Sequence, residues 1–252
     1  MDSDQIKNFY DELANDYDSM IRLDARLLKE EPILRDVVER NNLRKILDAG
    51  CGTGFHSILL AKLGCKVTAV DVSEKMLTQL QNNSSKYGVS VKTVLSSFKE
   101  LETNVNPGFD AVFCMGNSLP HLLTIEDVRK ALDNFYSILN KSGKLFLQIL
   151  NYDKILSEKK KVQNVREVQG KTFIRYYTFG ESLVEFNIMT IIKTGDNLDT
   201  DLQSILLFPI KKELLGRALA DSKFINVNYY GSISKDIYNP MESNDIFIVA
   251  EK

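Results

Sequence analysis

Short apolar runs alternate with helical patterns along the first 150 residues, and this alternation restricts the fold more than any other feature. The runs at 44–50, 65–73, 109–116 and 143–150 contain few polar residues, as strands do when both faces of a parallel sheet are covered. Between them, segments such as 124–140 carry apolar residues at helical spacing. Strand–helix–strand units of this kind cross over right-handedly. The sequence therefore predicts an α/β protein with a doubly wound, Rossmann-like sheet.

The pattern changes before and after this region, which divides the chain into four segments. Residues 1–42 predict helices, and residues 43–156 predict the core sheet. Consecutive strand-like runs without helices in 157–208 predict a small antiparallel β insertion. The lysine-rich run at 158–163 is interpreted as a solvated loop. A helix and two strands in 209–252 are expected to complete the core sheet.

Composition excludes several classes of protein. The formal net charge of −2 does not favour nucleic-acid binding, and no apolar stretch approaches the roughly 18 residues of a membrane span. Cys51, Cys65 and Cys114 show no CxxC spacing and are expected to be reduced thiols, and the polar N-terminus does not resemble a signal peptide, so a cytoplasmic protein is expected. His56 and His121 lie on different loops, and no metal site is predicted.

The loop 48–56, DAGCGTGFH, follows the first predicted strand and opens a helix. Gly50, Gly52 and Gly54 leave bare backbone at the carboxyl end of a strand, where open α/β sheets bind ligands. The spacing is G-x-G-x-G, whereas loops that bind the pyrophosphate of a dinucleotide have G-x-G-x-x-G. The loop therefore predicts a binding site for a ligand other than NAD.

Two carboxylates accompany the loop. Asp48 would repel a phosphate, but it suits the ammonium of an amino-acid moiety, and we expect it to contact the ligand. Asp71 ends the next predicted strand, where a carboxylate can accept hydrogen bonds from both ribose hydroxyls. A helix cap before Ser73 is the alternative role for Asp71.

The stretch ILDAGCGTGFHSILLAKLGCKVTAVDVSEKML resembles the first two motifs of class I S-adenosylmethionine-dependent methyltransferases. The resemblance implies a seven-stranded sheet with its last strand antiparallel, and S-adenosylmethionine bound to segment 43–156, with S-adenosylhomocysteine as the product. It places Met76 and Phe98 beside the adenine, although both could be ordinary core residues. Ser97 stands where many relatives carry an Asp that binds the adenine amino group. Val72 and Met115 complete the donor-binding residues that we expect.

The segment FYDELANDYDSMIR resembles the lid of small-molecule methyltransferases. The resemblance implies that Tyr17 and Arg22 close over the methionine carboxylate of the donor and that Tyr10 lines the acceptor pocket. Amphipathic packing of a surface helix is the alternative for all three residues.

Two further stretches, FDAVFCMGNSLPHLL and LFLQILNYDKIL, resemble glycine and sarcosine N-methyltransferases. The resemblance implies that Asn117 lies near the reacting methyl group and that Asn151 and Tyr152 border the acceptor. His121 is a candidate general base.

One position departs from that group. The glycine enzymes carry an arginine just before NYD, where it holds the substrate carboxylate, whereas this chain has Leu150. Leucine cannot form a charge-assisted bond to a carboxylate. We therefore expect no turnover of glycine or sarcosine, unless Arg175 supplies the cation from the insertion; an exposed strand arginine is the alternative.

The sequence thus favours an S-adenosylmethionine-dependent methyltransferase that acts on a small molecule at nitrogen, with no nucleic-acid or membrane partner. A non-catalytic protein that binds S-adenosylmethionine is the first alternative. An NAD-dependent oxidoreductase is the second, against which the glycine spacing and Asp48 argue. The oligomeric state stays open.

Overall fold

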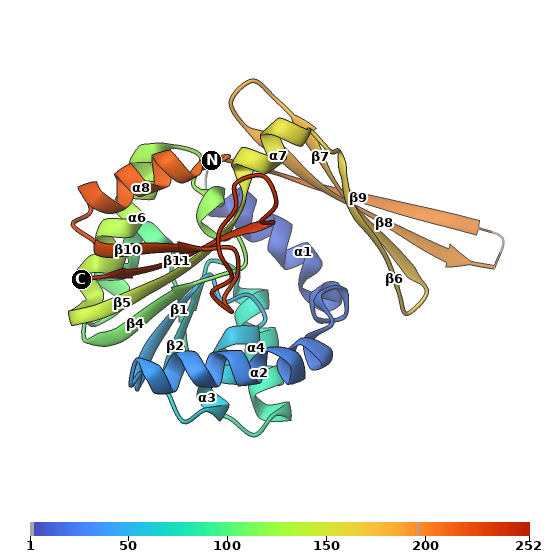
Figure 1. Cartoon of the computed structure of the whole chain (residues 1–252). Helices are drawn as coiled ribbons and strands as arrows, with labels where there is room; N and C mark the ends of the chain where they lie inside the picture. Colours follow the sequence, from blue (N-terminus) through green and yellow to red (C-terminus); the bar gives the residue numbers. More distant parts are fainter. Residues whose placement is uncertain (1–2, 196) are drawn as a thin grey trace.

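The computed structural model describes residues 3–195 and 197–252. Its main sheet has seven strands in the order β10-β11-β5-β4-β1-β2-β3 (Figure 1). Strands β1 to β5 run parallel, and β11 is antiparallel to both of its neighbours. The predicted sheet with an antiparallel last strand is therefore confirmed. The bounds are Lys45–Ala49, Lys66–Asp71, Lys92–Leu95, Phe109–Cys114 and Leu139–Leu150 for β1 to β5, Ile225–Tyr230 for β10 and Asp245–Glu251 for β11.

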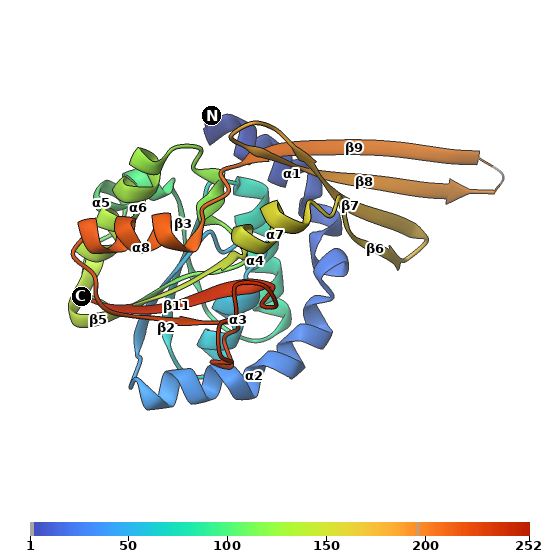
Figure 2. The same cartoon turned by 45° about the horizontal axis from the view of Figure 1, so that its top comes forward.

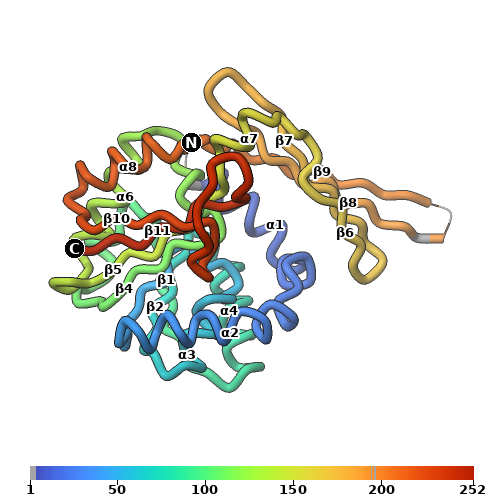
Figure 3. The backbone as a smooth tube through the Cα atoms, in the orientation of Figure 1, coloured from blue at the N-terminus to red at the C-terminus, as the bar shows by residue number. Residues whose placement is uncertain are grey.

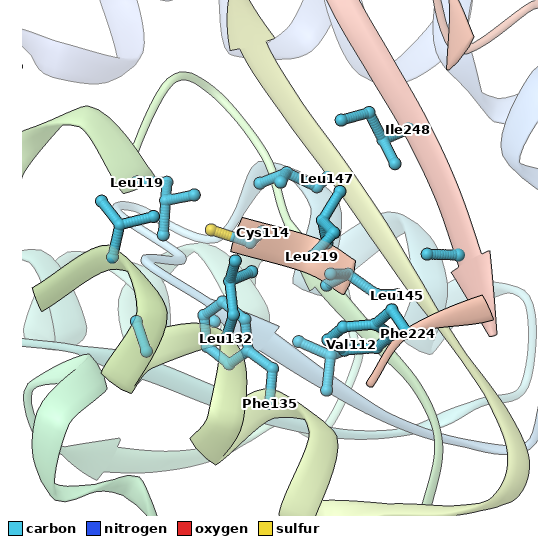
Figure 4. Packing of buried hydrophobic residues seen from close by; sticks show 14 of the residues in the cluster. Val112, Cys114, Leu119, Leu132, Phe135, Leu145, Leu147, Leu219, Phe224 and Ile248 are labelled. Carbon is cyan, nitrogen blue, oxygen red and sulfur yellow. The ribbon is translucent and has the colours of Figure 1, made fainter. Parts of the chain in front are cut away.

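Helices cover both faces of this sheet. On one face, α2 and α3 pack over apolar side chains such as Ile46 and Phe113. On the other, α6 and α8 cover Val112 and Leu145, and Figure 4 shows Phe135 of α6 against these strands. The two apolar layers explain why the strands lack polar alternation. The bounds are Leu23–Arg40 (α2), Phe55–Lys62 (α3), Glu74–Lys86 (α4), Leu101–Asn104 (α5), Ile125–Ile138 (α6), Tyr152–Glu158 (α7) and Lys212–Asp221 (α8), with 3-10 turns at Phe98–Glu100 and Leu119–His121.

The chain leaves the core after α7, forms a second sheet and returns before α8 (Figure 3). This sheet is antiparallel in the order β6-β7-β8-β9, with bounds Val162–Val168, Lys171–Phe179, Val184–Thr194 and Asn197–Leu207. The solvated loop predicted at 158–163 is wrong at both ends, because α7 ends at Glu158 and β6 begins at Val162. This edge strand has no buried residue. It therefore needs no apolar face, and its sequence carries no clear strand pattern.

Helix α1, Ser3–Ile21, lies between the core and the insertion (Figure 2). Asp11 accepts a hydrogen bond from Ser73 Oγ of the core at 2.5 Å. Asp16 pairs with Lys171 of the insertion at 2.7 Å. Polar contacts to both sides therefore fix this helix above the carboxyl ends of the core strands.

Candidate functional site

A cavity of about 470 Å³ opens at the carboxyl ends of the parallel strands, beneath α1. Its volume lies in the range of small-molecule sites. Loops after β1, β2, β3 and β4 form its floor and walls. The residues that line it include ten predicted from the sequence: Tyr10, Tyr17, Gly50, Gly52, Asp71, Val72, Ser97, Phe98, Met115 and His121.

The three loop glycines have different roles. Gly50 has φ of +72°, and a Cβ there would lie 2.7 Å from Ser118 Oγ, so the loop requires glycine at this point. Gly52 also has a positive φ and lines the cavity with its backbone. Gly54 lies outside the lining, and a Cβ there would lie 2.5 Å from Leu80 Cγ. The predicted ligand contact of Gly54 is therefore not observed, since this glycine allows α3 and α4 to pack closely.

Asp71 holds the loop and also faces the cavity. One carboxylate oxygen accepts from the backbone N–H of Gly52 at 2.8 Å, and the other accepts from Ser73 N–H at 3.0 Å. Burial raises the pKa of this carboxyl group, against the lowering effect of these hydrogen bonds. The helix-cap alternative does not hold, because Ser73 is the N-cap of α4 and its Oγ accepts from Met76 N–H at 3.0 Å. The ligand-facing role of Asp71 is compatible with this geometry.

Asp48 does not line the cavity, in contrast to the sequence prediction. Only 2% of its surface is exposed, and Oδ2 accepts a hydrogen bond from Ser57 Oγ at 2.6 Å. Burial raises its pKa to about 6. Because strand side chains alternate between faces, Asp48 is directed into the protein interior. It therefore supports the loop through α3.

At the end of the cavity where the sequence predicts the adenine, Phe98 lines the wall and packs edge-on against Phe135 at 5.4 Å between ring centroids. Ser97 Oγ donates to a carboxylate oxygen of Glu100 at 2.7 Å, and both residues lie on the cavity wall. Glu100 was not predicted from the sequence. Met76 is fully buried in the cluster around Phe173 and does not line the cavity, which favours the core alternative over the predicted adenine contact.

At the other end of the donor loop, Tyr17 lines the cavity and Arg22 does not. Arg22 is exposed and has a left-handed backbone conformation, with φ of 56°, where α1 ends and α2 begins. Arg26 lines the cavity instead, with its guanidinium 4.0 Å from the centroid of the Phe55 ring. Arg26 lies one helical turn after Arg22. The sequence alone therefore does not show which of the two arginines faces the cavity, because that depends on where the helix breaks.

Tyr10 and His121 form a hydrogen-bonded pair on the wall of the cavity. Tyr10 Oη lies 2.8 Å from His121 Nε2, although the residues are 111 positions apart. Burial raises the pKa of Tyr10 and lowers that of His121 to about 4. Both groups are therefore neutral near pH 7. The low pKa makes His121 a weak general base.

The three remaining acceptor residues from the core form an internal network and do not line the cavity. Asn117 Nδ2 donates to Tyr152 Oη at 3.0 Å, and its Oδ1 accepts from Leu150 N–H at 3.0 Å. Asn151 is fully buried and donates to two main-chain carbonyls in the 240–243 loop. These side chains are turned away from the cavity, because Asn117 bonds Tyr152 and the end of β5 while Asn151 bonds the loop before β11, so their predicted substrate contacts are not supported by this geometry.

The comparisons with known proteins agree with this geometry. Residues 46–143 match the family described as "Methyltransferase domain". The chain is 31% identical to a glycine/sarcosine N-methyltransferase of Aphanothece halophytica, over 100% of this chain and 92% of the relative. A second enzyme of that name, from Halorhodospira halochloris, is 30% identical over 98% and 89%. The chain therefore belongs to the family of S-adenosylmethionine-dependent methyltransferases that includes these two relatives.

The fold of this methyltransferase is similar to that of a solved S-adenosylmethionine-dependent methyltransferase from Clostridium acetobutylicum. The TM-score is 0.81 at 21% identity, and the match covers 96% of this chain and 98% of the solved one. The chain is thus an S-adenosylmethionine-dependent methyltransferase with the fold of that solved structure. The NAD-dependent oxidoreductase and the non-catalytic binding protein are set aside.

The cavity of the methyltransferase fits this donor. Bare backbone at Gly50 and Gly52 allows close approach, and the Asp71 carboxylate faces the same space. Within residues 3–195 and 197–252, no helix is long and apolar enough to cross a membrane. The same residues contain no group of three or more metal-ligating side chains.

Proposed function

We propose that this methyltransferase acts on the amine of a small amino acid of the glycine and sarcosine type. The observation that carries the proposal is the extent of the similarity: it spans the whole chain, including α1 and the insertion, and so includes the acceptor side as well as the donor loop. A match restricted to the donor motifs would carry no information on the acceptor.

The donor side of the cavity supports binding by backbone and carboxylate groups. We propose that Gly50 and Gly52 pass beneath the donor, that Asp71 accepts from its ribose, and that the Ser97–Glu100 pair binds the adenine amino group. S-Adenosylmethionine supplies a methyl carbon activated by positive sulfur. The protein then has mainly to align the acceptor with that carbon, which is catalysis by proximity.

On the acceptor side, the Tyr10–His121 pair supports orientation of the amine. The neutral Tyr10 oxygen can accept an N–H hydrogen bond from the amine, while His121 holds the phenol through Nε2. Such a bond would direct the nitrogen lone pair away from Tyr10. Since the pKa of His121 is lowered to about 4, it cannot efficiently hold a proton taken from an ammonium. We therefore propose that the pair positions an amine that is already deprotonated.

The test is release of S-adenosylhomocysteine with glycine or sarcosine at millimolar concentration. Turnover of either is the expected result. It would contradict the expectation drawn from Leu150 alone, under which a carboxylate has no cation at the end of β5. Absence of turnover with both, together with turnover of an amine that has no carboxylate, would overturn the proposed acceptor class.

A further inference from the structure

Arg175 of β7 lies on the face of the insertion that α1 covers. It pairs directly with Ile188 of β8, so the two side chains share a face. Ile188 is buried in the cluster formed with α1, which Tyr10 and Tyr17 also contact. Phe173, two residues before Arg175, belongs to the same cluster. The register of the sheet thus places a cation beside the tyrosines that line the cavity.

The guanidinium of Arg175 has no anionic partner within the described residues. Its Nε is buried and makes no hydrogen bond to any of them. No carboxylate among the described residues forms an ion pair with it, whereas Lys171 of the same strand pairs with Asp16. Burial lowers the pKa of the guanidinium.

The groups around this cation do not neutralise it. Tyr10, Tyr17 and Tyr177 interact with Arg175 electrostatically, and burial raises the pKa of each phenol, so all three are uncharged near pH 7. The other charged neighbour is Arg166, which is also a cation. Removing a charge from water without a partner is unfavourable. An anionic ligand at this position would remove that cost.

The end of β5, on the core side, has the reverse character. Leu150, at the end of β5, packs in an apolar cluster with Tyr177 and Phe186 of the insertion. Within the described residues, the side chain at the end of β5 is thus apolar and supplies no cation. Any carboxylate that enters between the core and the insertion would be attracted to the insertion side.

We propose that Arg175 binds the carboxylate of the methyl acceptor, from the opposite side to the strand-end position that Leu150 occupies. The inference rests on the proposed function and specifies how the acceptor is recognised. A planar guanidinium can donate two parallel hydrogen bonds to a carboxylate. The acceptor class is then an amino acid with a free carboxylate, whose amine extends toward Tyr10 and His121.

The test uses the full-length protein with Arg175→Gln and Arg175→Lys, and measures kcat and KM for glycine and sarcosine together with the Kd of S-adenosylhomocysteine. We expect Arg175→Gln to raise the acceptor KM at least about 30-fold, as when a buried charge pair loses one member, with kcat changed less than about threefold. The Kd of S-adenosylhomocysteine should stay within about twofold, because Arg175 lies outside the donor wall. Arg175→Lys, which keeps the charge, should give an intermediate KM.

Arg166→Gln is the matched control, since Arg166 lies on the neighbouring strand and donates to the Met20 carbonyl. Its acceptor KM should equal that of the wild type. Glycinamide, which lacks the carboxylate, provides a second control: the wild type should prefer glycine, and Arg175→Gln should lose this preference.

An unchanged acceptor KM in a folded Arg175→Gln variant would overturn the role of Arg175 and leave the proposed function standing. If that variant does not fold, wild-type discrimination against glycinamide and the KM of Arg175→Lys decide the question. Equal turnover of glycine and glycinamide by the wild type would also overturn the proposal. Failure of the wild type to methylate any amino acid would overturn the proposed function and the role of Arg175 together.

Discussion

On the donor side, the cavity wall is built from loops that each follow a core strand, and its central part is the segment from Gly50 to His56 without Gly54. On the proposed acceptor side, the lining residues Tyr10 and His121 come from α1 and from the turn after β4, and Arg175, which we propose as the carboxylate-binding residue, comes from the insertion. The donor wall uses backbone groups and one carboxylate, whereas the acceptor wall uses side chains from distant segments. A local motif therefore defines the first wall, and the packing of α1 and the insertion defines the second.

The largest expected effect concerns Asp48, which looks like a donor ligand in sequence and is buried in the structure. Its pKa is raised from 3.8 to about 6, so the folded protein binds this proton more tightly than the unfolded chain. Stability should therefore fall as the pH rises from about 4 to 6. Asp48→Asn should remove this loss and stabilise the protein at pH 8 by about 3 kcal/mol.

Urea unfolding of Asp48→Asn at pH 4 and pH 8 measures this effect, with S-adenosylhomocysteine affinity as the second readout. Donor affinity should be unchanged. Asp110→Asn is the control of opposite sign, because hydrogen bonds from Lys45 and Arg44 lower the pKa of Asp110. A large loss of donor affinity in Asp48→Asn would restore the contact predicted from the sequence.

The next effect concerns Asp71, the carboxylate that does face the cavity. Asp71→Asn keeps an acceptor for Gly52 N–H but removes the charge, and donor binding should weaken by about 2 kcal/mol. Calorimetric titration with S-adenosylhomocysteine measures it. An unchanged affinity would mean that Asp71 serves only the loop and Ser73.

A smaller effect is expected on the acceptor side. Tyr10→Phe removes the hydroxyl that bonds His121 Nε2, so the amine would be less well oriented. We expect kcat to fall about tenfold, and the Kd of S-adenosylhomocysteine to change less than about twofold. Steady-state kinetics with the acceptor varied at saturating donor provide the measurement. An equal loss in donor affinity would show that the two walls are not separable.

The smallest effect should come from the adenine end. Ser97→Ala removes the hydroxyl that bonds Glu100, and the loss of one hydrogen bond should weaken donor binding by about 1 kcal/mol. Titration of Ser97→Ala beside Thr103→Ala, whose hydroxyl bonds only the local backbone at Glu100 O, provides the comparison. Equal affinities for the two variants would exclude Ser97 from adenine recognition.

The sequence by itself determined the core sheet, the antiparallel insertion, the position of the glycine loop and the cavity-facing Asp71. These features follow from local patterns: buried parallel strands are apolar throughout, and a loop at the carboxyl end of such a strand opens onto the ligand side. These patterns can be recognised without knowing which distant segments pack against them.

Only the tertiary structure decided which polar residues near the cavity face it. Asp48 and Met76 turn inward, and Arg26 replaces Arg22 because α1 ends at Ile21. Asn117 satisfies the end of a strand instead of facing the cavity. Side chains at strand ends and helix breaks can face either way, and long-range partners settle their direction.

The position of Arg175 depends on the whole assembly in the same way. Whether Arg175 is buried cannot be predicted from the strand sequence. It depends on the register of β7 with β8 and on the packing of α1 against that face. A strand sequence shows which residues share a face, because the period is two. It does not show which face is covered, since the covering helix comes from the other end of the chain.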